Sequence, residues 1–139
     1  MKPEEIVRQA LIVEMTKNLG FPKQLISVER EISTLPHLQG KKIPKRRFDI
    51  ICFASSVEKD LPLYPLLLVE CKAIALSENA LAQVFGYNYY VKAHFIALAN
   101  REGVVLVDRK GEMVRNGLLP YKELICLAMA AGKKSLSSA

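Results

Sequence analysis

Apolar side chains follow two spacings along this chain, and the spacing predicts where helices and strands lie. From Pro3 to Leu19 they recur every three or four positions, which is typical of a helix that packs on one side. Shorter runs rich in Ile, Val, Leu and Phe are typical of buried strands. Five such strands are predicted, at 25–32, 47–54, 66–73, 94–99 and 104–108.

Two further helices complete the pattern. One runs from the capping residue Ser77 to about Val91, and the other runs from Tyr121 to Gly132. The predicted order is therefore α-β-β-β-α-β-β-α, in which the second and third strands form an antiparallel hairpin. This order predicts the α/β class, with a mixed β-sheet flanked by helices.

Length and composition suit one domain with one core. The chain has 139 residues, of which 50% are hydrophobic and 24% charged. We expect the domain to span residues 1–132 and the small, polar residues 133–139 to form a flexible tail.

No apolar run approaches the roughly 18 residues of a membrane-spanning helix, and no signal peptide is recognised. Three widely spaced cysteines, interpreted as buried reduced thiols, favour a cytoplasmic location: Cys52, Cys71 and Cys126.

Charged residues interrupt two of the predicted strands. Val69-Glu70-Cys71-Lys72 ends the third strand, where alternation puts Glu70 and Lys72 on one face, roughly 6–7 Å apart. Asp49 interrupts the second strand. Buried charges are costly unless they pair or bind something. An acid beside an acid and a lysine on neighbouring strands is the set that a metal-dependent enzyme needs to cleave phosphodiesters.

A run of positive charge precedes Asp49. The formal net charge is +6, which gives a mild bias toward polyanions. Taken alone, the run favours a solvated loop. On the hairpin it lies near the rim of the acid site, where phosphate-backbone binding requires no base readout. The candidate nucleic-acid-binding residues in this stretch are Lys41, Lys42, Lys45, Arg46 and Arg47.

These residues, in this order, resemble the PD-(D/E)XK nuclease superfamily. The matching positions are Glu14 in the first helix, Asp49, the stretch Glu70-Cys71-Lys72, and Gln83-Val84-Phe85-Gly86-Tyr87. The last is a Gln-x-x-x-Tyr motif like that of RecB-like nucleases. Over roughly residues 2–108 the chain is most similar to the N-terminal nuclease domain of the restriction subunit of type I restriction–modification enzymes. Phe48 stands where the motif is named for a proline.

The resemblance implies a restriction-endonuclease-like core and a magnesium-dependent deoxyribonuclease. Asp49 and Glu70 would hold Mg²⁺, for which Mn²⁺ would substitute. The main-chain carbonyl of Cys71 would be a further ligand, and Glu14 would approach the ion directly or through water. Lys72 would orient the attacking water and stabilise the negative transition state.

The Gln-x-x-x-Tyr motif adds two expectations. Gln83 and Tyr87 are four residues apart and share a helix face. The resemblance implies that Gln83 lies near the active site and that Tyr87 supports DNA or the site. A helix-surface glutamine and a half-buried tyrosine would explain the pair equally well.

DNA is the expected partner, and a separate protein that delivers or selects DNA is a further candidate. The chain has no phosphate-binding loop for ATP and no recognition helix. Three alternatives stay open: a catalytically silent DNA-binding or protein-interaction module of the same fold, an RNA or repair nuclease such as a junction-resolving enzyme, and a structural domain whose acid pair is incidental. Substrate form, endo- or exonuclease action and oligomeric state are open as well.

Overall fold

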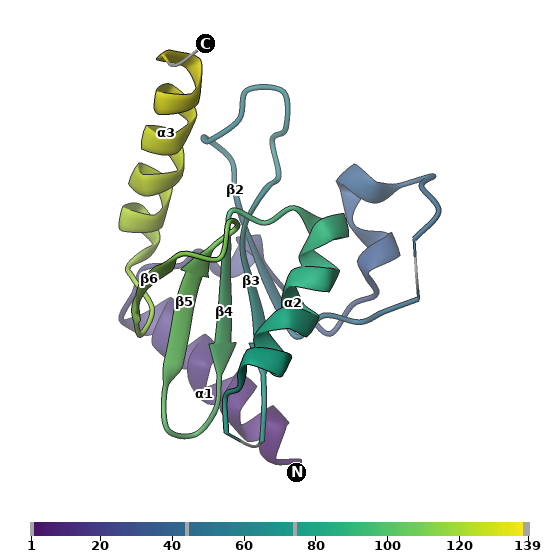
Figure 1. The fold of residues 1–139 in the computed structure, drawn as a ribbon, viewed down its shortest axis with the longest axis vertical. Helices are drawn as coiled ribbons and strands as arrows, with labels where there is room; N and C mark the ends of the chain where they lie inside the picture. The colour runs from purple at the N-terminus through teal and green to yellow at the C-terminus, as the bar shows by residue number, and fades with distance from the viewer. Residues whose placement is uncertain (1, 44, 74, 138–139) are drawn as a thin grey trace.

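A six-stranded mixed sheet forms the centre of the computed structural model (Figure 1). The structure describes residues 2–43, 45–73 and 75–137, with side chains described as far as residue 131. The helices are α1 (Pro3–Lys17), α2 (Glu78–Val91) and α3 (Tyr121–Ser137). The strands are β1 (Ile26–Val28), β2 (Ile50–Ala54), β3 (Tyr64–Cys71), β4 (Phe95–Ala99), β5 (Val104–Asp108) and β6 (Met113–Asn116). Three short 3-10 helices precede or follow β1: η1 (Lys23–Leu25), η2 (Ile32–Thr34) and η3 (Pro36–Leu38).

The strands lie in the sheet in the order in which they occur along the chain. Every neighbouring pair is antiparallel except β3 and β4, which are parallel. Parallel strands need a crossover connection, and α2 supplies it. The helix therefore begins at the end of the sheet where β3 ends and returns to the opposite end, where β4 begins (Figure 1).

Helices cover both faces of the sheet and produce two apolar cores. On one face, α1 packs through a stripe spaced four residues apart, Val7, Leu11 and Met15, and α3 adds Leu124 and Ala128. On the other face lie α2, η2 and η3, which pack on the sheet through a second set: Val84, Val91, Ile32, Leu35 and Leu38. Burial of these two stripes accounts for the helical spacing of apolar residues in the sequence.

The predicted α/β class is confirmed as a mixed sheet with three helices. The predicted hairpin is confirmed by the antiparallel pairing of β2 with β3. Ser77 caps α2, because its hydroxyl accepts a hydrogen bond from the amide of Ala80 at 3.1 Å. Pro3 lies in the first turn of α1, where a missing amide hydrogen costs nothing.

Three expectations need correction. The predicted order lacks β6, whose residues are mostly exposed and show no clear apolar alternation. The helix predicted to end at Gly132 continues to Ser137, so most of the expected tail is helical, and residues 138–139 lie outside the described residues. Cys52 and Cys71 are buried as expected, whereas Cys126 is exposed on α3.

Among the described residues, no helix has the length and apolar character needed to cross a membrane.

Candidate active site

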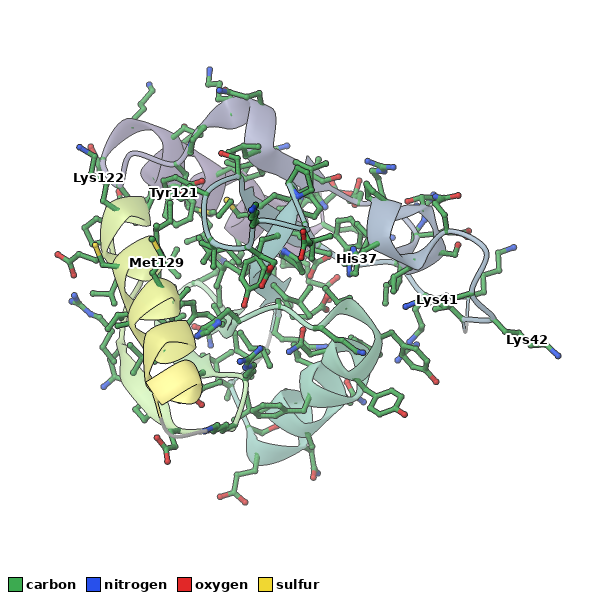
Figure 2. The ribbon with its side chains drawn as sticks, turned by 90° about the horizontal axis from the view of Figure 1, so that it is seen from above. His37, Lys41, Lys42, Tyr121, Lys122 and Met129 are labelled. Carbon is green, nitrogen blue, oxygen red and sulfur yellow. The ribbon has the colours of Figure 1, made fainter. Side chains whose placement is uncertain are left out.

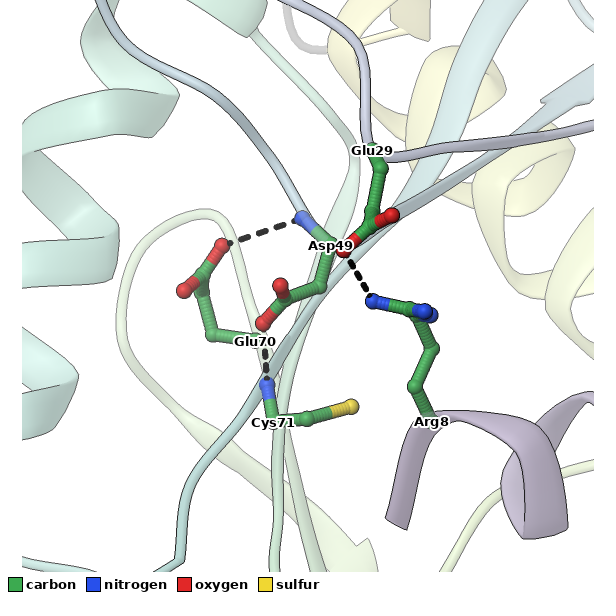
Figure 3. Close-up of polar contacts among 5 residues, drawn as sticks. All are labelled: Arg8, Glu29, Asp49, Glu70 and Cys71. Atoms are coloured by element: carbon green, nitrogen blue, oxygen red, sulfur yellow. Dashed lines mark hydrogen bonds and ion pairs between the residues drawn. The ribbon is translucent and has the colours of Figure 1, made fainter. Parts of the chain in front are cut away.

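The antiparallel pairing of β2 and β3 brings the two strand acids together. Ile50 pairs with Val69, so one further step along the register puts Asp49 opposite Glu70. The amide of Asp49 donates a hydrogen bond to Oε1 of Glu70 at 3.4 Å (Figure 3). The amide of Cys71 donates to Oδ2 of Asp49 at 2.7 Å. Each carboxylate is therefore held by the backbone of the neighbouring strand.

Glu70 is a buried acid beside a second acid. Its side chain is only 8% exposed. Burial first, and then the negative charge of Asp49, raises the pKa of Glu70 to about 8, although the Asp49 amide and the charge of Lys72 act in the opposite direction. Among the described residues the only ion pair is Arg8–Glu29, so Lys72 forms no salt bridge with either acid. Two adjacent carboxylates without a contacting cation are a donor set that suits a divalent metal ion.

Strand alternation places Lys72 on the same face as Glu70. Residues 70 and 72 lie two and four positions after Leu68, so they point to the same face of the sheet, the one covered by α2. Cys71 points to the opposite face and packs in the other core. The amide of Lys72 donates to the carbonyl of Ala99 at 2.8 Å, which keeps the backbone in the sheet one residue beyond β3. The ammonium is thus available on the side of the sheet that carries Glu70.

The structure does not bring Glu14 to the two acids. Its Oε2 accepts a hydrogen bond from Asn18 at 2.6 Å, and the side chain lines a groove with Asn100 and Arg101 between α1 and the β4–β5 turn. No group of three or more Asp, Glu, His and Cys side chains within the described part of the chain is arranged to hold a metal ion. The acid pair of Asp49 and Glu70 therefore stands without the helix glutamate.

Arg8, in the second turn of α1, lies next to the acid pair. Arg8 forms an ion pair with Glu29 directly beside Asp49, and the amide of Glu29 donates to the Asp49 carbonyl at 3.1 Å (Figure 3). Burial raises the pKa of the Cys71 thiol to about 12, and among the charges that act on this thiol are Arg8 and Glu4. Sequence reasoning missed these residues, although Glu4 and Arg8 have the spacing of one helix face.

The Gln-x-x-x-Tyr helix and the basic run meet through one contact. The guanidinium of Arg46 lies 4.3 Å from the centre of the Tyr87 ring and donates a hydrogen bond to the Tyr87 hydroxyl. Gln83 lies one turn earlier on α2 and is exposed. This contact docks the segment before β2 against the middle of α2.

The basic run divides into two clusters. Lys45, Arg46 and Arg47 lie together with Glu31, which forms a β-bridge with Arg47. Lys41 and Lys42 lie instead beside the C-terminal end of α2 (Figure 2). The sequence predicted one basic surface. The structure shows two: the cluster that contains Glu31 lies before β2, and Lys41 and Lys42 lie near the end of α2.

Comparison with known proteins gives one family match. The family described as "Type I restriction enzyme R protein N terminus" matches residues 3–119 of the 139. No curated protein and no solved structure matches the chain. The matched range extends from the start of α1 to just before α3 and includes Asp49, Glu70 and Lys72. The family supports a restriction-related, nuclease-like role, and the chain belongs to the type I restriction enzyme R protein N-terminus family.

Proposed function

We propose that this domain is a metal-dependent nuclease that hydrolyses phosphodiester bonds in DNA on a restriction-endonuclease-like core. The observation that carries the proposal is the acid pair: Asp49 and Glu70 are held side by side at the end of the sheet, and no cation contacts them among the described residues. A buried carboxylate next to a second carboxylate destabilises a fold. Because the chain belongs to a restriction enzyme family, we interpret this costly acid pair as catalytic.

The donor atoms at the acid pair fit magnesium. Mg²⁺ prefers hard oxygen ligands and binds through one or two carboxylates while it keeps several waters. Asp49, Glu70 and the main-chain carbonyl of Cys71 would supply the protein oxygens. Glu14 is left out of this set because its carboxylate bonds Asn18. A bound ion would lower the pKa of its water and neutralise charge on the phosphoryl oxygens, and Mn²⁺ has the same ligand preference.

The remaining residues bind and orient the DNA backbone. Lys72 lies on the face of Glu70 and would stabilise the negative charge that develops on the scissile phosphate. Its positive charge also favours the ionised form of Glu70, the form that binds a metal. Arg46, held against Tyr87, and the adjacent basic residues would contact phosphates without reading sequence. Gln83, which shares a face of α2 with Tyr87, would border the path of the DNA strand.

The family implies DNA and other subunits as partners. The acid pair with its metal ion and Lys72 would carry out cleavage, and the basic segment would bind the DNA backbone. Selection of a target would then depend on a separate protein, because these contacts are independent of base sequence.

Cleavage with matched variants tests the proposal. The chain would be incubated with supercoiled plasmid, linear duplex and single-stranded oligonucleotides in Mg²⁺, Mn²⁺ or EDTA. We expect cleavage with either metal, none in EDTA, and losses of at least about 100-fold in Asp49→Asn, Glu70→Gln and Lys72→Ala.

Two exposed residues of α3 provide matched controls for this assay. Glu123→Gln makes the same chemical change as Glu70→Gln, and Lys122→Ala makes the same change as Lys72→Ala, both away from the acid pair. These controls should keep the parent rate. Cleavage that persists in EDTA, or that survives both carboxylate substitutions, would contradict the proposal.

A further inference from the structure

A second positively charged surface lies at the C-terminal end of α2. It is a hollow of about 250 Å³ formed by two segments, residues 38–43 and residues 89–92. We refer to it as the lysine–tyrosine hollow. Because α2 begins beside the end of β3, this hollow lies at the other end of the helix from the acid pair (Figure 1). At about 1.5 Å per residue, the 14 residues of α2 make a helix about 21 Å long.

Three lysines, Lys41, Lys42 and Lys92, give the hollow its positive charge. None of the described residues that line it is acidic. The pKa of the neighbouring His37 is lowered mainly by burial and further by the charges of Lys41 and Lys92. The cluster before β2 differs in this respect, because Glu31 lies among its basic residues. Lysines from a loop and from a helix end that line one hollow are suited to bind a polyanion.

An exposed aromatic ring lies at the edge of the same hollow. Tyr89 is 75% exposed, more than any other large hydrophobic side chain among the described residues. The ring of Tyr90 packs edge-on against it, with centroids 5.2 Å apart and an interplanar angle of 88°. One neighbour thus supports the ring while much of its surface remains open to a planar ligand.

Hydrogen bonds among their sequence neighbours hold the lining residues of the hollow in place. The ring of His37 lies with Nε2 2.8 Å from the carbonyl of Val91, which ties η3 to the end of α2. The side chain of Asn88 bonds both backbone groups of Ala93, at 2.7 and 3.0 Å. Lys92 takes a left-handed conformation, with φ of 59°, that ends the helix. The surface is therefore preorganised, which lowers the entropic cost of binding.

We propose that the lysine–tyrosine hollow binds single-stranded DNA, with phosphates against its lysines and a base stacked on Tyr89. Aromatic stacking combined with a basic groove is the general means of binding single strands without sequence preference. A base within a duplex has no free face to stack, so the exposed ring favours a single strand. The choice of DNA as the polyanion rests on the proposed function. A strand in the hollow would continue along α2, past Arg46 and Tyr87, toward the acid pair.

Binding in EDTA tests this surface without cleavage. Fluorescence anisotropy would compare a labelled oligothymidine, an abasic strand of the same length and a duplex. Tyr89→Ala should weaken oligothymidine binding about 10-fold and leave the abasic strand unaffected, while Tyr89→Phe should keep parent affinity. Lys92→Gln should weaken both single strands and reduce the salt slope by about 0.7.

Controls come from α3, which lies across the molecule from Lys41 and Lys42 (Figure 2). Lys122→Ala removes an exposed positive charge and Met129→Ala an exposed apolar side chain, and both should bind like the parent. Unchanged oligothymidine affinity in Tyr89→Ala, or an equal loss on the abasic strand, would overturn the stacking site. Tyr89-dependent binding confined to RNA would overturn the choice of DNA.

The two proposals fail in different ways. If strand binding depends on Tyr89 but no metal-dependent cleavage occurs, the proposed nuclease activity is refuted and the proposed strand-binding site is not. If Asp49→Asn abolishes a metal-dependent cleavage but strand binding does not depend on Tyr89, only the proposed strand-binding site is refuted.

Discussion

Asp49, directly before β2, faces Glu70 on β3, and the side chain of each accepts a hydrogen bond from a main-chain amide of the opposite segment. No lysine or arginine forms an ion pair with either carboxylate among the described residues. Their mutual repulsion must therefore be relieved by a proton or by an added cation. Arrangements of this kind reduce stability and are retained where activity needs them.

Neutralising one acid should stabilise the protein in chelator. Asp49→Asn keeps the side-chain shape and its carbonyl oxygen can still accept from the Cys71 amide. We expect a gain of about 1 kcal/mol in the free energy of unfolding in EDTA, seen as a melting temperature a few degrees higher. Glu123→Gln, at an exposed position, should change it by less than about 0.5 kcal/mol.

Magnesium should stabilise the parent and not this variant. A ligand that binds only the folded state adds about 2.7 kcal/mol at one hundred times its Kd. Thermal melting with and without millimolar magnesium measures the difference between the two proteins. If Asp49→Asn is less stable than the parent in EDTA and both respond equally to magnesium, Asp49 has a structural role.

The basic cluster before β2 should determine the salt dependence of duplex binding. Replacing Lys45, Arg46 and Arg47 with alanine should weaken binding and reduce the slope of log affinity against log salt by roughly 0.9 per lost phosphate contact. Arg46→Lys keeps the charge and removes the planar group that stacks on Tyr87, so it should weaken binding with little change in slope. Lys122→Ala serves as the charge control, and an unchanged slope in the triple variant would place the duplex surface elsewhere.

Stability should fall in mild acid because of His94. Its Nδ1 lies 2.8 Å from the Tyr64 hydroxyl, and burial, followed by the charge of Arg109, lowers the pKa of His94 to about 4. An unfolded histidine titrates near 6.5, so between those values the unfolded chain binds more protons than the folded chain. We expect this difference in proton binding to lower the free energy of unfolding by about 2 kcal/mol from pH 7 to pH 5.

Urea denaturation across this pH range measures the effect, and His94→Gln identifies its source. The variant cannot take up the proton, so its stability should change less between pH 7 and pH 5. An identical pH profile for parent and variant would assign the acid sensitivity to other groups.

The buried amide of Asn88 should be important for stability. It bonds the amide and the carbonyl of Ala93 and so closes the turn between α2 and β4. Asn88→Ala leaves two backbone groups without these partners in a buried position, which should cost about 2–3 kcal/mol in urea denaturation. Asn79→Ala, in the exposed first turn of α2, is the matched control and should cost less than about 1 kcal/mol.

The cysteines should differ in reactivity. Burial raises the pKa of Cys52 and Cys71 to about 12, so both thiols stay protonated and shielded in the native state. Cys126 is exposed on α3. A maleimide reagent should therefore modify one site rapidly in the native protein and three after unfolding. Rapid native labelling that persists in Cys126→Ser would show that a strand cysteine is accessible.

Local patterns in the sequence were sufficient to predict the central elements. Alternation and helical spacing are properties of neighbouring residues, so they identified β2, β3, β5 and the start of α2 within a few positions. The hairpin predicted that the two acids lie in one site, but the long connection, residues 55–63, left the register of the two strands open. Pairing of Ile50 with Val69 puts Asp49 opposite Glu70, as expected of two acids in one site.

Tertiary packing decided what surrounds that pair. The rotation of α1 about its axis, set by burial of Val7, Leu11 and Met15, places Arg8 beside Asp49 and turns Glu14 toward a different groove. Docking of the loop before β2 divides one run of basic residues into two surfaces, because Arg46 stacks on Tyr87 while Lys41 and Lys42 join Lys92. Strand β6 also depends on pairing with β5, since its residues show no clear apolar alternation. Local spacing specifies an element and its apolar face, but contacts between elements distant in sequence determine which polar residues meet.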